Sequence, residues 1–460
     1  MPESAAGPSA EGLRVAVVGA GPAGFYAAEL LAKRGAEVDL FERLPAPFGL
    51  LRYGVAPDHQ NIKRAGAAFE RTAQLPNVHY FGNVNVGVDV SVGELLSDYD
   101  QLLVATGSAR DRHLGIAGEE LEGSVPATAF VGWYNAHPDF SDRGFDLSGE
   151  RAVVVGVGNV ALDVVRILAR RPDELAATDI ASYALGALKE SRIREIVVLG
   201  RRGPAQAAFD ASELADIATL ENVDLYLDGD PPLGHAKGLD AHQHAHTLRN
   251  LEYLATLPRS PQKPLADRRV RLRFLTSPKA MVGEKGHVTA LDVEHNELVE
   301  HADGSFSARG TGHIERIETR LVIRSIGYQA TPIEGLPFDE QHSLVPNDKG
   351  RVGLAGEPVA RCYVVGWIKR GPVGLLGSNK QDARETVDAM LADAASALSE
   401  RARRTKGSVI GLLGRREVRH VSYADWLRID AKERQRGAES SKIREKFATV
   451  PTLLEALSTD

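Results

Sequence analysis

Two glycine-rich turns in this chain have the spacing that lets a protein backbone bind phosphate. The first, GAGPAG at Gly19–Gly24, follows the apolar run Val15–Val18, and the second, GVGNVA at Gly156–Ala161, follows Ala152–Val155. Glycine allows backbone N–H groups to approach a pyrophosphate at the start of the next helix, where the helix dipole favours negative charge. One such turn binds one dinucleotide, so two turns predict two dinucleotides in one chain. That pattern is typical of flavoproteins that take electrons from a nicotinamide.

The residues that follow each turn differ. Glu42 ends the strand expected after the first turn, and its carboxylate would accept hydrogen bonds from ribose hydroxyls. The strand expected after the second turn ends in Gly200, Arg201 and Arg202. Two arginines attract and can bind bidentately the 2′-phosphate that distinguishes NADP from NAD, whereas an acid there would repel it. We therefore predict NADP(H) as the second nucleotide; the alternative for this pair is a solvated surface position.

His59 and Glu213 are the candidates for proton transfer. His59 lies in a turn-rich segment, Glu213 lies on an expected helix after Phe209, and histidine titrates near neutral pH. From spacing alone, a structural role remains the alternative for both. A histidine-rich stretch has no matching cysteine or carboxylate set, so we predict no metal site there; its members are His235, His242, His244 and His246.

The elements that must position these residues form two βαβ units. In the first we expect a strand at Leu13–Gly19, a helix at Pro22–Arg34 and a strand at Glu37–Glu42, a unit of about 30 residues. The second begins at Arg151 and ends at Gly200, with an insertion around 171–192. It is nested within the sequence of the first domain. Further expected elements are a helix near 246–257, antiparallel strands over 271–299, strands at 321–327 and 362–366, and a helix over 379–398.

Length, charge and cysteine content narrow the class of protein. A chain of 460 residues indicates two or three domains. A net charge of −7 argues against nucleic acid as a partner, and no apolar run is long enough for membrane insertion. Cys362 is the only cysteine, which excludes an internal disulfide, a redox cysteine pair and a cysteine-ligated cluster within this chain. A single thiol fits a reducing, cytoplasmic location.

Longer motifs occur in an order that resembles a known family. They include Gly19–Ala28, Phe48–His59, Gly158–Asp163, Gly200–Pro204 and Gly366–Pro372. From about Leu13 to Leu398 the chain resembles the adrenodoxin-reductase-like family of ferredoxin–NADP reductases, including its actinobacterial members. The resemblance implies an α/β fold with two nucleotide-binding, Rossmann-like domains, one inserted in the other. The domains would be a disordered tail (1–12), an FAD-binding domain (13–108 and 325–400), an NADP-binding domain (109–324) and a charged helical C-terminal extension (401–460).

The resemblance also implies site residues, carried over by position. His59 and Glu213 would lie near the flavin and the nicotinamide and influence proton or hydride steps. Related sequences often have Asn at position 157 and a proline-containing turn at 115–118, so Val157 and Gly115–Gly118 are departures expected to alter nucleotide affinity. The FAD contacts would be Gly19, Gly21, Ala23, Gly24, Glu42, Leu50, Val86, Trp367, Gly374, Leu375 and Leu376. The NADP contacts would be Arg112, Gly158, Asn159, Val160, Arg201, Arg202, Glu213 and Gly374.

The function implied is a ferredoxin–NADP reductase that passes electrons from NADPH through FAD to a ferredoxin-type iron–sulfur protein, one at a time. An acidic ferredoxin would require a basic docking face, for which Lys369 with Arg370, or the arginines between 268 and 273, are candidates. One alternative is an FAD/NADPH oxidoreductase acting on a small organic substrate. Another, from a different class, is a nucleotide-binding regulatory module without turnover. The lone Cys362 excludes a disulfide-reducing flavoenzyme.

Overall fold

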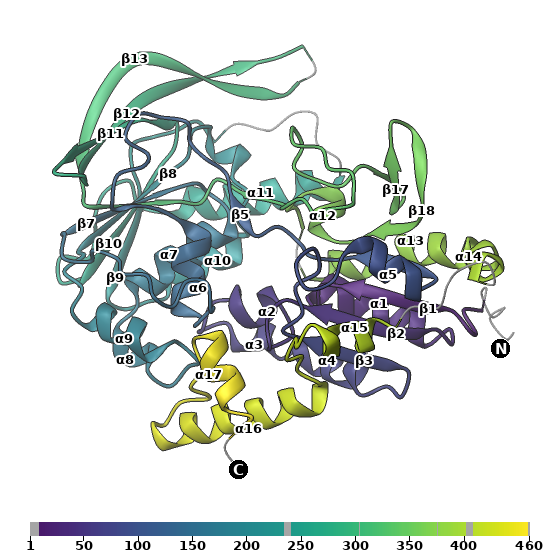
Figure 1. Ribbon diagram of the computed structural model, residues 1–460. Coiled ribbons are helices and arrows are strands. Elements are labelled where there is room, and N and C mark those ends of the chain that lie inside the picture. The colour runs from purple at the N-terminus through teal and green to yellow at the C-terminus, as the bar shows by residue number, and fades with distance from the viewer. Residues whose placement is uncertain (1–8, 234–240, 303, 375, 402–407, 459–460) are drawn as a thin grey trace, which may run out of the picture.

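The structure, a computed structural model, describes residues 9–233, 241–302, 304–374, 376–401 and 408–458. Two α/β units lie side by side in it, each built around its own sheet (Figure 1). The first sheet has seven strands in the order β16-β17-β18-β4-β1-β2-β3. These strands are β1 (Arg14–Val18), β2 (Glu37–Glu42), β3 (Val78–Gly82), β4 (Gln101–Val104), β16 (Asn347–Asp348), β17 (Arg351–Leu354) and β18 (Glu357–Val364).

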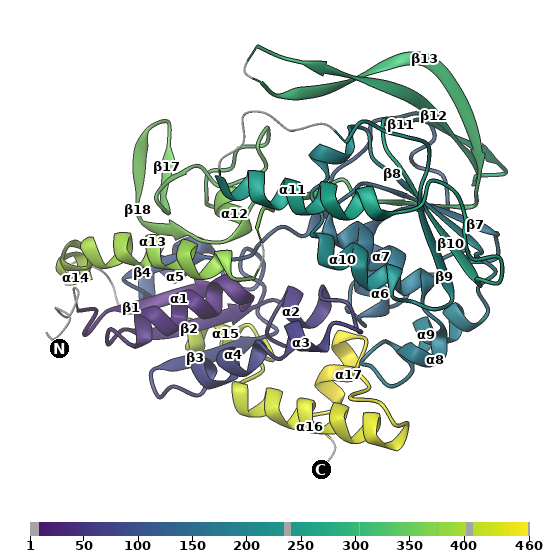
Figure 2. The same cartoon turned by 180° about the vertical axis from the view of Figure 1, so that it is seen from behind.

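The central strands of this sheet are apolar because both of their faces are covered. Helices α1 (Pro22–Ala32) and α13 (Ser378–Ala392) pack on the face that carries Val15 and Val17 (Figure 2). Helices α5 (Val92–Asp98) and α15 (Val409–Arg415) pack on the opposite face. Strands buried on both sides are expected to be continuous apolar runs, as the VAVV of β1 is. The same unit holds the helices α2 (Leu50–Tyr53), α3 (Gln60–Lys63), α4 (Gly66–Ala73), α12 (Trp367–Arg370) and α14 (Ala394–Arg401).

The second unit has a six-stranded, all-parallel sheet in the order β6-β14-β7-β8-β10-β9. Its strands are β6 (Ser124–Pro126), β7 (Arg151–Val155), β8 (Glu195–Leu199), β9 (Val223–Leu227), β10 (Arg268–Arg273) and β14 (Leu321–Arg324). Its helices are α6 (Ala127–Tyr134), α7 (Asn159–Ala169), α8 (Pro172–Leu175), α9 (Ser182–Lys189), α10 (Ala211–Ala218) and α11 (Ala241–Thr256), with a short 3₁₀ turn at Pro204–Gln206. Helices α8 and α9 occupy the predicted insertion.

A separate antiparallel sheet covers one face of the six-stranded sheet. It consists of β11 (Thr276–Glu284), β12 (His287–Glu300) and β13 (Phe306–Glu318). The prediction of antiparallel strands over 271–299 is therefore right for most of that range and wrong at its start. Residues 271–273 belong to the parallel strand β10, whose arginines are held within the fold by acids: Arg271 pairs with Asp228, and Arg273 pairs with Glu315.

All strands of the six-stranded sheet lie between Ser124 and Arg324, whereas the seven-stranded sheet takes strands from both sides of that range. This confirms the prediction of two α/β units, one inserted in the other. The chain passes between the units twice, and the two passages pair with each other: β5 (Arg110–Asp111) runs antiparallel to β15 (Tyr328–Gln329).

The C-terminal segment is helical and contacts both units (yellow in Figure 1). After α15 come α16 (Tyr423–Glu439) and α17 (Val450–Glu455). Val421 exchanges two backbone hydrogen bonds of 2.8 Å with Gly82 at the end of β3, and Lys446 forms an ion pair of 2.8 Å with Asp179 in the inserted unit. We call residues 408–458 the strap.

The described part of the leader, from Ser9 on, is packed. Ala10 is buried, and its amide donates to the carbonyl of Arg34 at 2.9 Å; the rest of the tail predicted at 1–12 lies outside the described residues. No helix in the described chain is both long and apolar enough to cross a membrane.

Candidate active site

The first glycine turn is closed on one side and open on the other. Gly19 has φ +105°, and a Cβ on it would lie 2.6 Å from the carbonyl oxygen of Ala105. Gly21 is the N-cap of α1, and a Cβ on it would meet no atom within 4 Å. A Cβ on Gly24 would collide with the Gly19 carbonyl, which explains the third glycine. The turn therefore leaves the N-terminus of α1 accessible, as phosphate binding requires.

Glu42 clamps this turn to the end of β2. Its carboxylate accepts hydrogen bonds from the backbone amides of Ala20 (3.0 Å) and Leu44 (3.1 Å). Burial raises the pKa of Glu42, and these amide contacts oppose that rise. A carboxylate oxygen has two lone pairs, so Glu42 retains acceptor capacity toward a ribose.

The remaining predicted FAD contacts come from both ends of the chain. A Cβ at Gly366 would lie only 2.7 Å from the Cβ of Ala23, so the turn before Trp367 meets the first glycine turn. The Trp367 ring lies 5.4 Å from that of Tyr328. Leu50 begins α2, directly after Gly49, whose Cβ position lies 3.1 Å from the Cα of Gly21. Val86 and Leu376 are half-buried and Gly374 is exposed, while Leu375 lies outside the described residues.

The second turn repeats the geometry of the first. Gly156 has φ +127°, and a Cβ on it would lie 2.0 Å from the carbonyl oxygen of Ser325, whereas Gly158, the N-cap of α7, has open space beside it. Asn159 is fixed by two hydrogen bonds with Asp210: its amide donates to the carboxylate at 2.9 Å and its oxygen accepts from the Asp210 backbone at 2.7 Å. Val160 is half-buried behind it.

Val157, one of the two departures from related sequences, holds the next loop in place. Its carbonyl oxygen accepts hydrogen bonds from the amides of Ala208 (2.9 Å) and Phe209 (3.1 Å). Both of these contacts are made by the backbone, so they do not depend on which side chain stands at position 157.

Arg201 and Arg202 follow β8 with their backbone fixed and their charges unpaired. The carbonyl of Arg201 accepts from the Asn296 side chain at 2.8 Å, and that of Arg202 accepts from the Leu275 amide at 3.0 Å. Among the described residues, neither guanidinium has a hydrogen-bond or ion-pair partner. Burial and the neighbouring charge of Arg201 lower the pKa of Arg202. Two adjacent guanidinium groups that lack a partner among the described residues are able to bind an anion. Arg112 is exposed at the passage between the units, where its amide donates to the Gly327 carbonyl at 3.2 Å.

His59 and Glu213 come from different units and meet where the two units contact each other. His59 Nε2 lies 3.8 Å from Glu213 Oε2 and 3.7 Å from Asp216 Oδ2, and its Nδ1 lies 3.7 Å from Asp163 Oδ1. The structure thus brings together His59 and Glu213, which were separate candidates in the sequence. Their ligand atoms, with those of Asp216, form a group that could hold a metal, all within 4.8 Å of one another. Glu213 already binds a guanidinium, however, so the group has a cation beside it.

That guanidinium belongs to Arg166, which sequence reasoning missed. Its side chain is fully buried on α7 and pairs with Asp58 (2.7 Å), Asp163 (2.5 Å) and Glu213 (2.8 Å). The available signal was a charged residue on the apolar face of α7, four positions after Leu162. Asp163 lies three residues earlier on the same helix, whereas Asp58 and Glu213 come from separate segments that no local pattern connects to Arg166.

The acids around Arg166 differ in protonation tendency. Burial raises the pKa of Asp163, and burial together with the charge of Asp163 raises that of Glu213. Burial acts in the same direction on Asp58, but the hydrogen bond and charge of Arg166 outweigh it and lower the pKa of Asp58. Asp163 and Glu213 are therefore the carboxyl groups of this cluster in which burial favours the protonated form, whereas Arg166 favours the ionised form of Asp58.

The structure contradicts part of the predicted docking face. Lys369 is buried and pairs with Asp382 (2.7 Å) and Glu385 (2.6 Å). Arg268 and Arg273 are buried as well. Their charges serve the fold because β10 and α12 lie inside the molecule, which the alternation of charged and apolar residues did not reveal. In the histidine-rich stretch, His246 pairs with Asp210 at 3.1 Å, and His235 lies outside the described residues.

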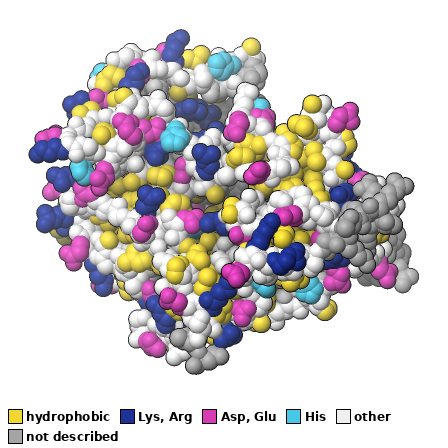
Figure 3. All heavy atoms as spheres, viewed as in Figure 1, with side chains coloured by type: hydrophobic (Ala, Val, Ile, Leu, Met, Phe, Trp, Pro, Cys, Tyr) yellow, Lys and Arg dark blue, Asp and Glu magenta, His cyan; other side chains and the backbone are white. Residues whose placement is uncertain are grey.

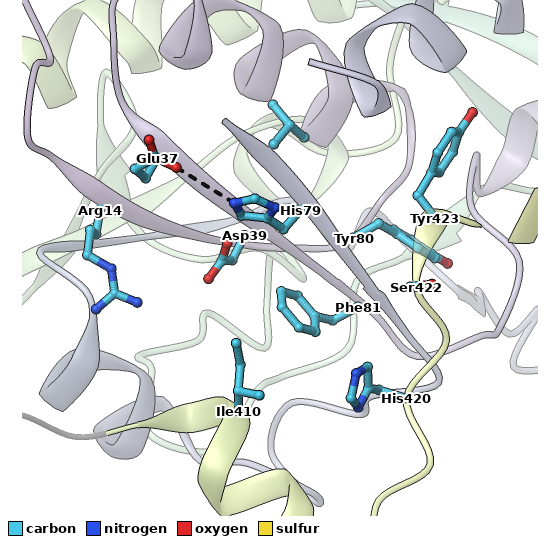
Figure 4. A pocket seen from close by; sticks show the side chains of 11 residues that line it. Arg14, Glu37, Asp39, His79, Tyr80, Phe81, Ile410, His420, Ser422 and Tyr423 are labelled. Carbon is cyan, nitrogen blue, oxygen red and sulfur yellow. Dashed lines mark ion pairs between the residues drawn. The ribbon is translucent and has the colours of Figure 1, made fainter. Parts of the chain in front are cut away.

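A pocket of about 530 Å³ lies away from the cleft, at the edge strand β3 (Figure 4). Its charged groups pair locally: Glu37 contacts His79 at 3.7 Å, and Asp39 accepts from Tyr99 at 2.5 Å. None of the predicted site residues lines it.

The fold and the site define a class of proteins with two similar glycine turns, one in each of two α/β units. A model of the family described as Pyridine nucleotide-disulphide oxidoreductase matches residues 13–198. The NADPH-ferredoxin reductase FprA of Mycobacterium leprae (strain TN) is 43% identical over 450 residues, which are 96% of this chain and 97% of that protein. The mitochondrial NADPH:adrenodoxin oxidoreductase of Arabidopsis thaliana is 41% identical and covers 97% of this chain and 96% of its own length.

Solved structures give the same result. The structure described as Mycobacterium tuberculosis FprA in complex with NADPH matches with a TM-score of 0.89 at 42% identity, over 97% of this chain and all of that one. The chain belongs to the adrenodoxin-reductase-like family of NADPH-ferredoxin reductases. The family predicted from the motifs is thereby confirmed.

Proposed function

We propose that this protein is an FAD-dependent ferredoxin–NADP reductase, which passes electrons from NADPH through FAD to a ferredoxin-type iron–sulfur protein, one at a time. The observation that carries the proposal is that two otherwise similar glycine turns have different partners. Glu42 stands beside the first turn, and the unpaired Arg201 and Arg202 stand beside the second. An acid suits a ribose hydroxyl, and a pair of arginines suits a 2′-phosphate.

The residues present fit both FAD and NADP(H). Gly21 and Gly158 leave the N-termini of α1 and α7 open to a pyrophosphate, and the turn before Trp367 closes on Ala23. Bound FAD would accept two electrons as a hydride and release them singly. The chain's own part is to orient the nucleotides and to hold a proton. His59 and Glu213 supply an imidazole and a carboxylate where the units meet, and Arg166 positions Glu213.

The unit boundaries support an assignment of the cofactors. We assign FAD to residues 13–108 and 325–400 and NADP to residues 109–324, because each range contains one glycine turn and one of the two large sheets, the seven-stranded and the six-stranded. The iron–sulfur nature of the acceptor and a cytoplasmic location are further parts of this proposal. The buried, single Cys362 supports an external acceptor, since this chain has no redox cysteine pair.

Electron transfer tests the proposal directly. Purified protein loaded with FAD should lose its flavin absorbance on addition of NADPH, and should then reduce cytochrome c only when a ferredoxin is present. Flavin reduction without ferredoxin-dependent transfer would favour the small-substrate oxidoreductase. Absence of flavin reduction would contradict every reading in which the chain is an NADPH-dependent enzyme.

The arginine pair gives a sharper test. Replacing Arg201 and Arg202 together with Ala should weaken NADPH binding roughly 100-fold, because charge-assisted bonds to a phosphate are lost. NADH binding should change little, because NADH lacks the 2′-phosphate. Equal losses for the two nucleotides would refute the assignment of the pair.

A further inference from the structure

The β12–β13 hairpin extends beyond the sheet that it belongs to, and we call residues 294–300 and 306–314 the arm. In Figures 1 and 2 the arm projects from the six-stranded unit and arches over its edge. Residues 309–314 are exposed, as expected of a free hairpin. The next residues toward the tip, Phe306, Ser307 and Ala308, are half-buried again. A stretch of a projecting strand that is less exposed than the residues on either side of it contacts another part of the molecule.

The arm docks on the loop that carries the arginine pair. The buried Asn296 donates to the Arg201 carbonyl at 2.8 Å and to the Ser277 hydroxyl at 2.7 Å. Leu298 packs on Gly203, where a Cβ would meet its Cδ1 at 3.0 Å. The register places Leu298 opposite Ala308 and Glu300 opposite Phe306, so these contacts fix the tip of β13 as well.

The docked arm encloses a pocket of about 230 Å³. Its walls are Arg201, Arg202, Ser277 and residues 306–308. Figure 3 shows basic side chains in the recess beneath the arm. The nearby acid Glu297 is paired with Arg309 at 2.7 Å. The pocket therefore combines two unpaired guanidinium groups, two hydroxyls and one aromatic ring. This set suits a phosphate attached to a nucleoside.

We propose that the arm is the outer wall of the site for the 2′-phosphoadenosine end of NADP(H). Ser307 donates to the 2′-phosphate alongside Arg201 and Arg202, and the Phe306 ring covers the adenine. This inference rests on the proposed function. The inference adds to that function that NADP is distinguished from NAD by groups on two sides of the pocket: the loop after β8 and the arm.

Binding of adenosine 2′,5′-bisphosphate and adenosine 5′-monophosphate, measured by calorimetry on the FAD-loaded protein, separates the roles. Ser307→Ala should weaken binding of the bisphosphate about tenfold and leave the monophosphate unchanged, because a hydrogen bond to a charged group is lost. Phe306→Ala should weaken both about tenfold, because a stacking surface is lost. The matched control, Thr311→Ala in the exposed part of the arm, should change neither. Retained flavin absorbance shows that each variant is folded.

Trypsin cleavage after the exposed Arg309 is a second measurement. The bisphosphate should slow this cleavage in the native protein and not in Ser307→Ala. If the native protein binds the bisphosphate through Arg201 and Arg202 while the arm variants bind it equally well and cleavage is unaffected, the arm proposal is wrong and the function stands. If the native protein does not bind the bisphosphate, the NADP assignment fails with it.

Discussion

Arg166 joins three acids from separate segments on one buried side chain. Removing one member of a buried ion network leaves uncompensated charges in a poorly solvated site. We expect Arg166→Met to lower the free energy of unfolding by about 3–5 kcal/mol, measured by urea denaturation. Arg170→Met is the matched control: Arg170 also contacts Asp58 but is a quarter exposed, so its loss should cost less than about 1 kcal/mol. Similar losses for the two variants would contradict the central role of Arg166.

Cys362 is the only thiol, and its surroundings make it unreactive. Burial raises its pKa to about 11, so little thiolate exists at pH 8. We expect a thiol reagent such as dithiobisnitrobenzoate to label the native protein at least 100-fold more slowly than the urea-unfolded protein. Rapid labelling of the native protein would show that the strand β18 opens, and would reopen thiol chemistry as a function.

Among single residues, the sequence predicts those whose role depends on their local position in the chain. Arg201 and Arg202 stand at a strand end after a glycine turn, and that position alone indicates a phosphate site. Asp58, Asp163 and Arg166 gain their role from contacts between units, for which the sequence contains no local signal. The prediction for Lys369 was wrong because a lysine is normally solvated, whereas Lys369 lies on α12 and is buried against Asp382 and Glu385.

The two glycines of the second turn, Gly156 and Gly158, have different structural roles. Gly156→Ala would place a Cβ 2.0 Å from a backbone oxygen at a φ of +127°, so we expect loss of several kcal/mol of stability or failure to fold. Gly158→Ala meets no atom and should leave the melting temperature within about 2 °C.

Gly158→Ala should still weaken NADP binding, because the added methyl group points into the space left for the pyrophosphate. Thermal melting and calorimetric titration of both variants check this pair. A folded Gly158→Ala protein with unchanged affinity would show that the open side of this turn does not face the nucleotide.

Elements with a strong period were predictable: β1 and α1 end within two residues of the expected ranges, and β7 begins at the expected Arg151. The helix expected over 379–398 is divided into α13 (Ser378–Ala392) and α14 (Ala394–Arg401). The strand β10 was not predictable, because RRVRLR resembles a half-exposed strand, whereas Arg268 and Arg273 are buried, and Arg271 and Arg273 pair with Asp228 and Glu315. The arm was also missed beyond residue 299, since two strands that bury almost nothing leave no hydrophobic pattern to read.

The strap connects the two units through buried charges. Asp179 of the inserted unit accepts from Lys446 of the strap and from Lys63 of the other unit, at 2.8 Å and 2.7 Å. Although burial alone would raise the pKa of Asp179, the two ammonium groups hold it well below its ordinary value. A lowered pKa means that Asp179 stabilises the folded state above pH 4 or so and loses this contribution as the pH falls further.

Asp179→Asn should therefore be less stable than the native protein by about 3 kcal/mol at pH 7, and the difference should shrink toward zero as the pH approaches the folded pKa. Urea denaturation of both proteins at pH 7, 5, 4 and 3 measures this. A difference that is constant with pH would show that the stabilisation by Asp179 is not ionic.

The arrangement of the units could be predicted because an inserted domain leaves a clear trace: a second glycine turn before the strands of the first sheet are complete. The role of the strap could not be predicted from the sequence. Its sequence is charged and helix-prone, which is equally typical of a solvated extension, and only the structure shows Glu433 and Lys446 buried against partners hundreds of residues earlier.

The position of the strap in the chain has a consequence for biosynthesis. Every other described element is translated before residue 408, yet the strap fixes how the two units face each other. A ribosome-bound chain can fold the inserted unit, whose strands are contiguous, while the seven-stranded sheet still lacks β16–β18. The cleft is therefore the last part of the molecule to be assembled. We expect flavin and nicotinamide nucleotide to meet in the correct geometry only after residues 408–458 have been synthesised and have docked on both units.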